Sequence, residues 1–71
     1  MELEINREYT LVNKDSVICF SKYGIDGIFK VFTRVEEQDY FYWNEEVFTI
    51  SEGKKLFKYL LKNGYRNINF N

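Results

Sequence analysis

Histidine, proline and alanine are all absent from this sequence of 71 residues. Without histidine, the chain lacks the commonest general base and the commonest zinc ligand. It also has no glycine-rich phosphate loop, no GxSxG context and no metal-ligand spacing. No motif is therefore present that would activate a nucleophilic side chain. The possible nucleophiles are Ser16, Cys19, Ser21 and Ser51. We expect a protein that is not an enzyme and that binds no metal or cofactor.

Cysteine occurs once, at Cys19, so the sequence offers no internal disulfide and no sign of an oxidising compartment. We expect Cys19 to be a small apolar side chain buried in a strand. No apolar run approaches the ~18 residues that cross a bilayer. The acidic first residues, MELEINRE, lack the apolar segment of a signal peptide. These absences predict a cytoplasmic location and no membrane contact.

Aromatic residues, in contrast, are abundant and make up 20% of the chain. A chain of this length is near the lower size limit for a core that folds without a disulfide or a metal. Aromatic side chains suit such a core because each one buries a large area. We therefore expect residues 1–71 to form a single small globular domain.

The net charge of −1 conceals two segments of opposite sign. Residues 1–53 hold all eleven acidic groups and five basic ones, a net charge of −6. Residues 54–71 hold the other five basic groups and no acid, a net charge of +5. Such segregation concerns surface potential and partners rather than the fold.

The clearest structural signal lies in residues 50–65. Leu56, Phe57, Leu60 and Leu61 recur at helical spacing, and lysines gather on the opposite side of the same helix. Thr49 and Ser51 both qualify as the N-cap, and Thr49 with Glu52 fits a capping box. Gly64 provides the left-handed conformation that a helix C-terminus needs. The stretch predicts one amphipathic helix lying on a sheet.

Alternation of apolar and polar residues predicts strands at 8–12, 17–23, 28–35, 40–44, 47–50 and 66–70, with turns at 13–16, 24–27 and 36–39. Segments 40–44 and 47–50 are either one bulged strand or two short ones. The last strand is expected at a sheet edge or beside the first strand. The predicted fold is α+β: an antiparallel meander of four to five strands, one amphipathic helix packed on one face and a short C-terminal strand.

One helix covers only one face of a sheet, yet the run Tyr40-Phe41-Tyr42-Trp43 places aromatics on both faces. The other face is then either solvated or an interface with a protein or a second copy. Acidic and aromatic side chains cluster around the hairpin predicted from strands 28–35 and 40–44. The candidate partner-binding residues are Glu36, Glu37, Asp39, Tyr40, Tyr42, Glu45 and Glu46. The alternative interpretation is a solvated loop whose charges prevent edge pairing.

The lysine face of the helix is a second candidate surface, made of Lys54, Lys55, Lys58, Lys62 and the nearby Arg66. Its simplest interpretation is the solvent-exposed side of an amphipathic helix. No acidic residue is interspersed there, however, so it could also contact phosphates or an acidic protein.

Together these features favour a small protein-binding protein that blocks a partner's surface, for example the basic groove of a nucleic-acid-binding enzyme. Its size and charge suit an inhibitor or anti-defence factor of a phage or mobile element, such as an anti-CRISPR protein. Two alternatives remain open: a nucleic-acid-binding module that uses the basic helix, and a homodimeric structural or adaptor protein.

Overall fold

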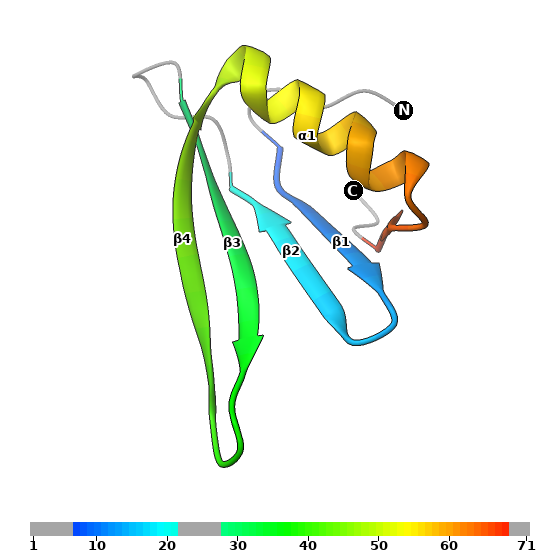
Figure 1. The fold of residues 1–71 in the computed structure, drawn as a ribbon. Helices are drawn as coiled ribbons and strands as arrows, with labels where there is room; N and C mark the ends of the chain where they lie inside the picture. Colours follow the sequence, from blue (N-terminus) through cyan, green and yellow to red (C-terminus); the bar gives the residue numbers. More distant parts are fainter. Residues whose placement is uncertain (1–6, 22–27, 69–71) are drawn as a thin grey trace.

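The computed structural model describes residues 7–21 and 28–68. The elements are β1 (Tyr9–Asn13), β2 (Ser16–Phe20), β3 (Ile28–Glu36), β4 (Phe41–Thr49), α1 (Ile50–Lys62) and β5 (Arg66–Asn67). The strands form one antiparallel sheet in the order β4-β3-β2-β1-β5, and α1 crosses one face of it (Figure 1). The predicted α+β meander with one helix and a short C-terminal strand is confirmed.

The β1–β2 turn is tighter than the sequence predicts. Asn13 and Ser16 are the last paired residues of the ladder, so the turn consists of Lys14 and Asp15 alone. Lys14 adopts a left-handed conformation with φ of 54°. β2 accordingly begins at Ser16, one residue earlier than predicted. The predicted turn at 24–27, and the end of the strand predicted to reach residue 23, lie outside the described residues.

β4 is one continuous strand. Its register with β3 runs without interruption from Ile28↔Thr49 to Glu36↔Phe41. A break or bulge at Asn44-Glu45-Glu46 was therefore the wrong expectation. These three polar side chains are exposed, so they stay solvated when the segment pairs as a strand.

The buried core lies between one face of the sheet and α1. It consists of Tyr9, Leu11, Ile18, Phe20, Val31, Phe57 and Leu60. Register explains the choice of face, because Tyr9 pairs with Phe20 and Phe20 pairs with Val31. Phe57 enters from the helix and is fully buried, and its ring contacts Tyr9 and Phe20 edge-on at 5.0 and 5.5 Å between centroids. The Leu/Phe stripe thus packs on the sheet as predicted.

Both helix ends follow the sequence signals. Of the two N-cap candidates, Thr49 is the cap, and its hydroxyl accepts from the Glu52 amide at 3.2 Å. The Glu52 carboxylate accepts from the Thr49 amide at 3.0 Å, which completes the capping box. Gly64 follows α1 with φ of +93°, the left-handed conformation expected there.

β5 is shorter than predicted and lies at a sheet edge, next to β1. Val12 pairs with Arg66 and Leu11 pairs with Asn67. The Ile68 amide also donates to the Thr10 carbonyl at 2.9 Å. The predicted continuation through residues 69–70 lies outside the described part of the chain.

Candidate protein-binding surface

The outer part of the β3–β4 hairpin projects beyond the rest of the sheet. Pairing between β2 and β3 extends only to Ile18↔Thr33, so the last three residues of β3 pair with β4 alone. This two-stranded extension, residues 34–43, is called the arm below. It extends past the β1–β2 turn, while α1 packs over the opposite end of the hairpin (Figure 1). Apart from the contact of its base with the β1–β2 turn, no described element packs on either face of the arm.

The arm exposes four consecutive aromatic residues. Tyr40 is 64% exposed, Phe41 56%, and Tyr42 and Trp43 44% each. They form two pairs: Tyr40 stacks on Tyr42 at 6.2 Å between ring centroids, and Phe41 meets Trp43 edge-on at 6.4 Å. Successive strand residues point to opposite faces, so the two pairs lie on opposite faces of the arm.

Arg34 connects the base of the arm to the body of the sheet. Its Nη2 forms an ion pair with Glu36 at 2.9 Å and donates to the Asp15 carbonyl in the β1–β2 turn at 3.3 Å. Its guanidinium carbon lies 5.9 Å from the centre of the Phe41 ring, within cation–π range. Its Nε is buried and has no hydrogen-bond partner among the described residues. Sequence reasoning missed Arg34, because its contacts depend on the cross-strand register.

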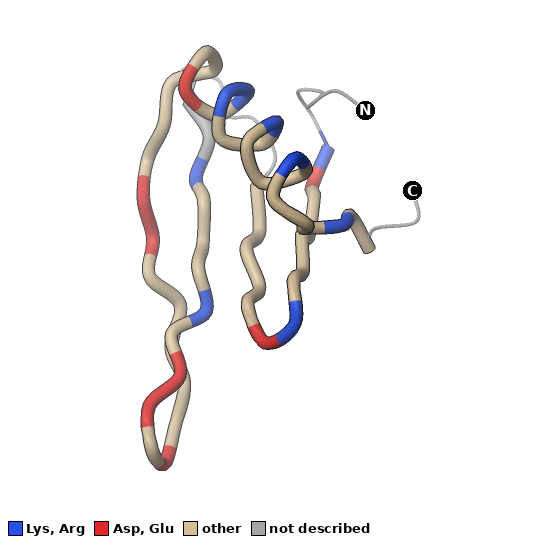
Figure 2. The backbone as a smooth tube through the Cα atoms, turned by 45° about the vertical axis from the view of Figure 1, so that its right-hand side comes forward, with Lys and Arg blue, Asp and Glu red and all other residues tan. Residues whose placement is uncertain are grey.

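The predicted acidic residues all belong to the hairpin, but they do not form one cluster. Glu36, Glu37 and Asp39 lie at the end of the arm, and Glu45 and Glu46 lie farther along β4 (Figure 2). Lys30 pairs with Glu45 at 3.8 Å. Among the described residues, Glu37, Asp39 and Glu46 have no cation within ion-pair distance. The end of the arm is consequently acidic.

The seven predicted partner-binding residues are also divided between the two faces of the sheet. Tyr42 and Glu46 share the face on which α1 packs, while Glu45 lies on the opposite, open face. The open face carries Phe41, Trp43 and Val47 as well. These three exposed apolar residues were not among the predicted site residues. Strict alternation along β4 identifies them once the face covered by the helix is known.

The predicted basic patch forms a separate surface. Lys54, Lys55, Lys58, Lys62 and Arg66 are all exposed, and none forms an ion pair with another described residue. The lysines follow the outer side of α1, and the end of the arm lies at the other end of the molecule (Figure 2). The charge segregation seen in the sequence is thus also a separation in space.

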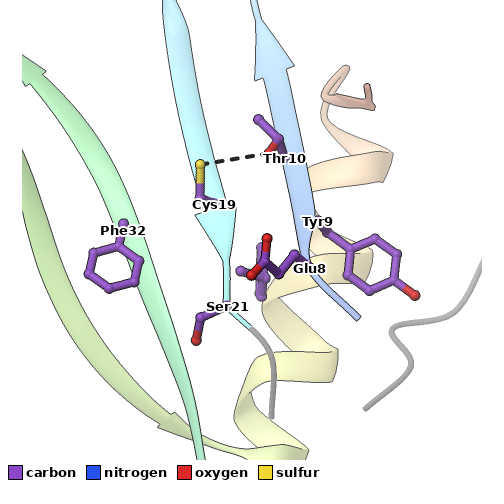
Figure 3. Close-up of a pocket in the computed structure, with 7 residues that line it drawn as sticks. Glu8, Tyr9, Thr10, Cys19, Ser21 and Phe32 are labelled. Carbon is purple, nitrogen blue, oxygen red and sulfur yellow. Dashed lines mark hydrogen bonds between the residues drawn. The ribbon is translucent and has the colours of Figure 1, made fainter. Parts of the chain in front are cut away.

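A hollow of about 220 Å³ lies on the open face where β1, β2 and β3 meet (Figure 3). Thr10, Cys19 and Phe32 are cross-strand neighbours there, and the Cys19 thiol donates to the Thr10 hydroxyl at 3.8 Å. Cys19 lies in a strand as predicted, but it is half-buried and outside the core. That part of the prediction was wrong because Ile18 and Phe20 occupy the face under the helix.

Within residues 7–21 and 28–68, no three His, Cys, Asp or Glu side chains come together as a metal site. No helix in that part of the chain is long and apolar enough to cross a membrane. Comparison with protein-family models, with curated proteins and with solved structures finds no match to this chain.

Proposed function

We propose that this chain is a small protein-binding protein whose arm occupies the surface of a partner. The observation that supports this most is the exposure of four consecutive aromatic residues on both faces of a projecting hairpin. Aromatic residues are enriched at protein interfaces and dominate their binding energy, because they bury large areas with little loss of side-chain entropy. Exposed apolar patches of this kind tend to mark interfaces.

The charge of the arm indicates the kind of surface that it fits. Glu37 and Asp39 lie beside the aromatic residues at its end. An acidic, aromatic protrusion is complementary to a basic concave surface, such as the nucleic-acid groove of an enzyme. By occupying such a groove, the protein would act as an inhibitor that competes with the nucleic acid. The anti-defence factors of phages and mobile elements are proteins that could work in this way.

Affinity capture from a bacterial lysate, with and without nuclease, tests this proposal. We expect the wild-type chain to retain the same protein with and without nuclease. The double variant Y42A/W43A should lose it. Tyr59→Ala is the control, because Tyr59 is an exposed aromatic residue on α1, at 62%. If Y42A/W43A captures the same protein as efficiently as Y59A, the arm is not the binding surface.

A second candidate function is non-specific nucleic-acid binding through the basic patch. The supporting observation is a row of exposed cations along α1, none of which forms an ion pair with a described acidic residue. About four phosphate contacts would give a logarithmic salt slope of about −3.6 on duplex DNA. Fluorescence anisotropy with single- and double-stranded probes tests this, with K54E/K58E as the variant. Absence of binding at low salt would exclude it.

A further inference from the structure

The free edge of β4 provides a more specific binding mode. We infer that this edge accepts an extended basic segment of the partner as an added strand of the sheet. The inference rests on the proposed function, and it specifies the class of partner and the type of contact. β4 is the outermost strand on its side of the sheet, nine residues long, and no described element covers its edge.

The hydrogen-bond phase of the hairpin shows which backbone groups are available. The Glu37 amide donates to the Tyr40 carbonyl at 2.8 Å, so the facing backbone groups of this pair point toward each other across the hairpin. In an antiparallel ladder such pairs alternate with pairs whose backbone groups point away from each other. The N–H and C=O groups of Phe41, Trp43, Glu45 and Val47 therefore point out of the sheet edge. Thr49 follows the same phase, since its amide bonds to Glu52 and not to β3.

The same residues place their side chains on the open face, next to those free backbone groups. Phe41, Trp43 and Val47 are 56%, 44% and 55% exposed. An added strand would satisfy the backbone of β4 and would also cover these three apolar side chains. Main-chain bonds supply affinity and alternate side chains supply specificity in this type of recognition.

The charge of β4 argues against a second copy of the chain as the occupant. Glu45 is the middle residue of β4, so antiparallel pairing of two copies along the full strand would set Glu45 against Glu45. Like charges directly opposite each other destabilise a sheet. Glu46 adds a further negative charge on the other face. Glu45 already pairs with Lys30 at 3.8 Å, whereas Glu46 has no cation within ion-pair distance among the described residues. A segment with lysine or arginine beside Glu46 and apolar side chains on the open face therefore gains an ion pair that a second copy does not offer.

The opposite edge of the sheet is a weaker candidate. β5 has two residues, of which Arg66 is exposed. An edge this short offers few backbone bonds, and its cation disfavours a basic segment. We therefore assign strand addition to β4.

A titration with synthetic peptides as long as β4 tests the inference by amide hydrogen exchange in NMR spectra. One peptide alternates lysine and valine, and a matched peptide alternates glutamate and valine. We expect the lysine peptide to slow exchange of the Trp43, Glu45 and Val47 amides by about tenfold at saturation. The Tyr42, Asn44 and Glu46 amides, which already bond to β3, should change little. Binding should weaken with salt, and the glutamate peptide should not bind.

Two variants at one position separate backbone from side-chain recognition. Val47→Pro removes an outward N–H, which an edge strand tolerates, whereas Val47→Ala removes only the side chain. Binding of the lysine peptide should fall by about fivefold more with V47P than with V47A, the effect of one lost hydrogen bond. Equal binding by V47P and V47A, or no difference in protection between the alternate amides, would overturn strand addition.

The failure of this inference differs from the failure of the proposed function. If V47P still captures the lysate protein that Y42A/W43A loses, the arm binds proteins through its side chains and strand addition is wrong. If Y42A/W43A captures the same protein as efficiently as the wild-type chain, the proposed function itself is wrong. Dimers in sedimentation of the protein alone, lost with V47P, would identify a second copy as the occupant and would overturn the assignment to a basic segment.

Discussion

The guanidinium of Arg34 lies over the ring of Phe41, 5.9 Å from its centre, just beyond the point where β3 stops pairing with β2. Arg34 also donates to the Asp15 carbonyl and pairs with Glu36. An isolated two-stranded ribbon is only marginally stable in water. Arg34 therefore joins the arm to the β1–β2 turn and holds the Phe41 ring beside it.

Replacing Arg34 with alanine should loosen the arm without unfolding the domain. We expect a loss of about 0.5–1 kcal/mol in the free energy of unfolding, typical of a partly exposed cation–π contact with an ion pair. Hydrogen exchange at the arm amides should accelerate more than exchange in β1 and β2. Arg34→Lys is the control, since it keeps the charge and loses the planar fork. Uniform acceleration across the sheet would contradict a local role for Arg34.

Phe57→Ala should abolish stable folding. Phe57 is fully buried and contacts the Tyr9 and Phe20 rings. Its truncation costs about 3–5 kcal/mol, comparable with the whole stability of a domain this small. Tyr59→Ala, two residues along the helix and 62% exposed, should cost less than about 0.5 kcal/mol. Urea unfolding followed by circular dichroism compares the two, and a cooperative transition in F57A near that of the wild type would contradict the core described above.

Gly64→Ala should destabilise the protein by about 1 kcal/mol through backbone strain, because Gly64 has φ of +93°. Crowding contributes little, since an added Cβ would lie at an ordinary 3.5 Å from Asn13 Nδ2. Gly64→Asn should cost less, because asparagine tolerates the left-handed conformation better. Thermal denaturation of the two variants is the measurement. An equal loss in both would indicate a cause other than conformational strain.

The capping box makes helix stability depend on pH. Hydrogen bonds from the Thr49 backbone and side chain hold the pKa of Glu52 below its ordinary value of 4.5. The carboxylate is thus favoured in the folded state, and its contribution is present above pH 4.5 and disappears as the pH falls through the lowered pKa. Glu52→Gln should reduce stability at neutral pH and make its acid dependence shallower. Parallel acid profiles for wild type and E52Q would contradict this linkage.

The sequence predicted the elements well where local chemistry determines them. The capping box at Thr49, the apolar stripe around Phe57 and the left-handed Gly64 each depend on neighbours a few residues away. The continuity of β4 was not predictable in the same way. Asn44-Glu45-Glu46 has the composition of a turn, and only pairing with β3 along its whole length makes it a strand.

The candidate surface was predicted in part, for a related reason. Alternation showed that aromatics near Tyr42 point to both faces, but it did not show that no described element covers them on either face of the arm. That depends on where β2 stops pairing with β3, at Thr33. The contacts of Arg34 likewise follow from register, which a period of two does not specify.

The strand order β4-β3-β2-β1-β5 has a consequence for folding kinetics. Each of the first four strands pairs with its neighbour in sequence, so the meander forms by closing short loops. The pairing of Leu11 with Asn67 is different, because it closes most of the chain into one loop. Hairpins should therefore form early and β5 should dock late. Until α1 docks, Tyr9 and Phe20 face solvent, and that interval is when the chain is most prone to aggregate.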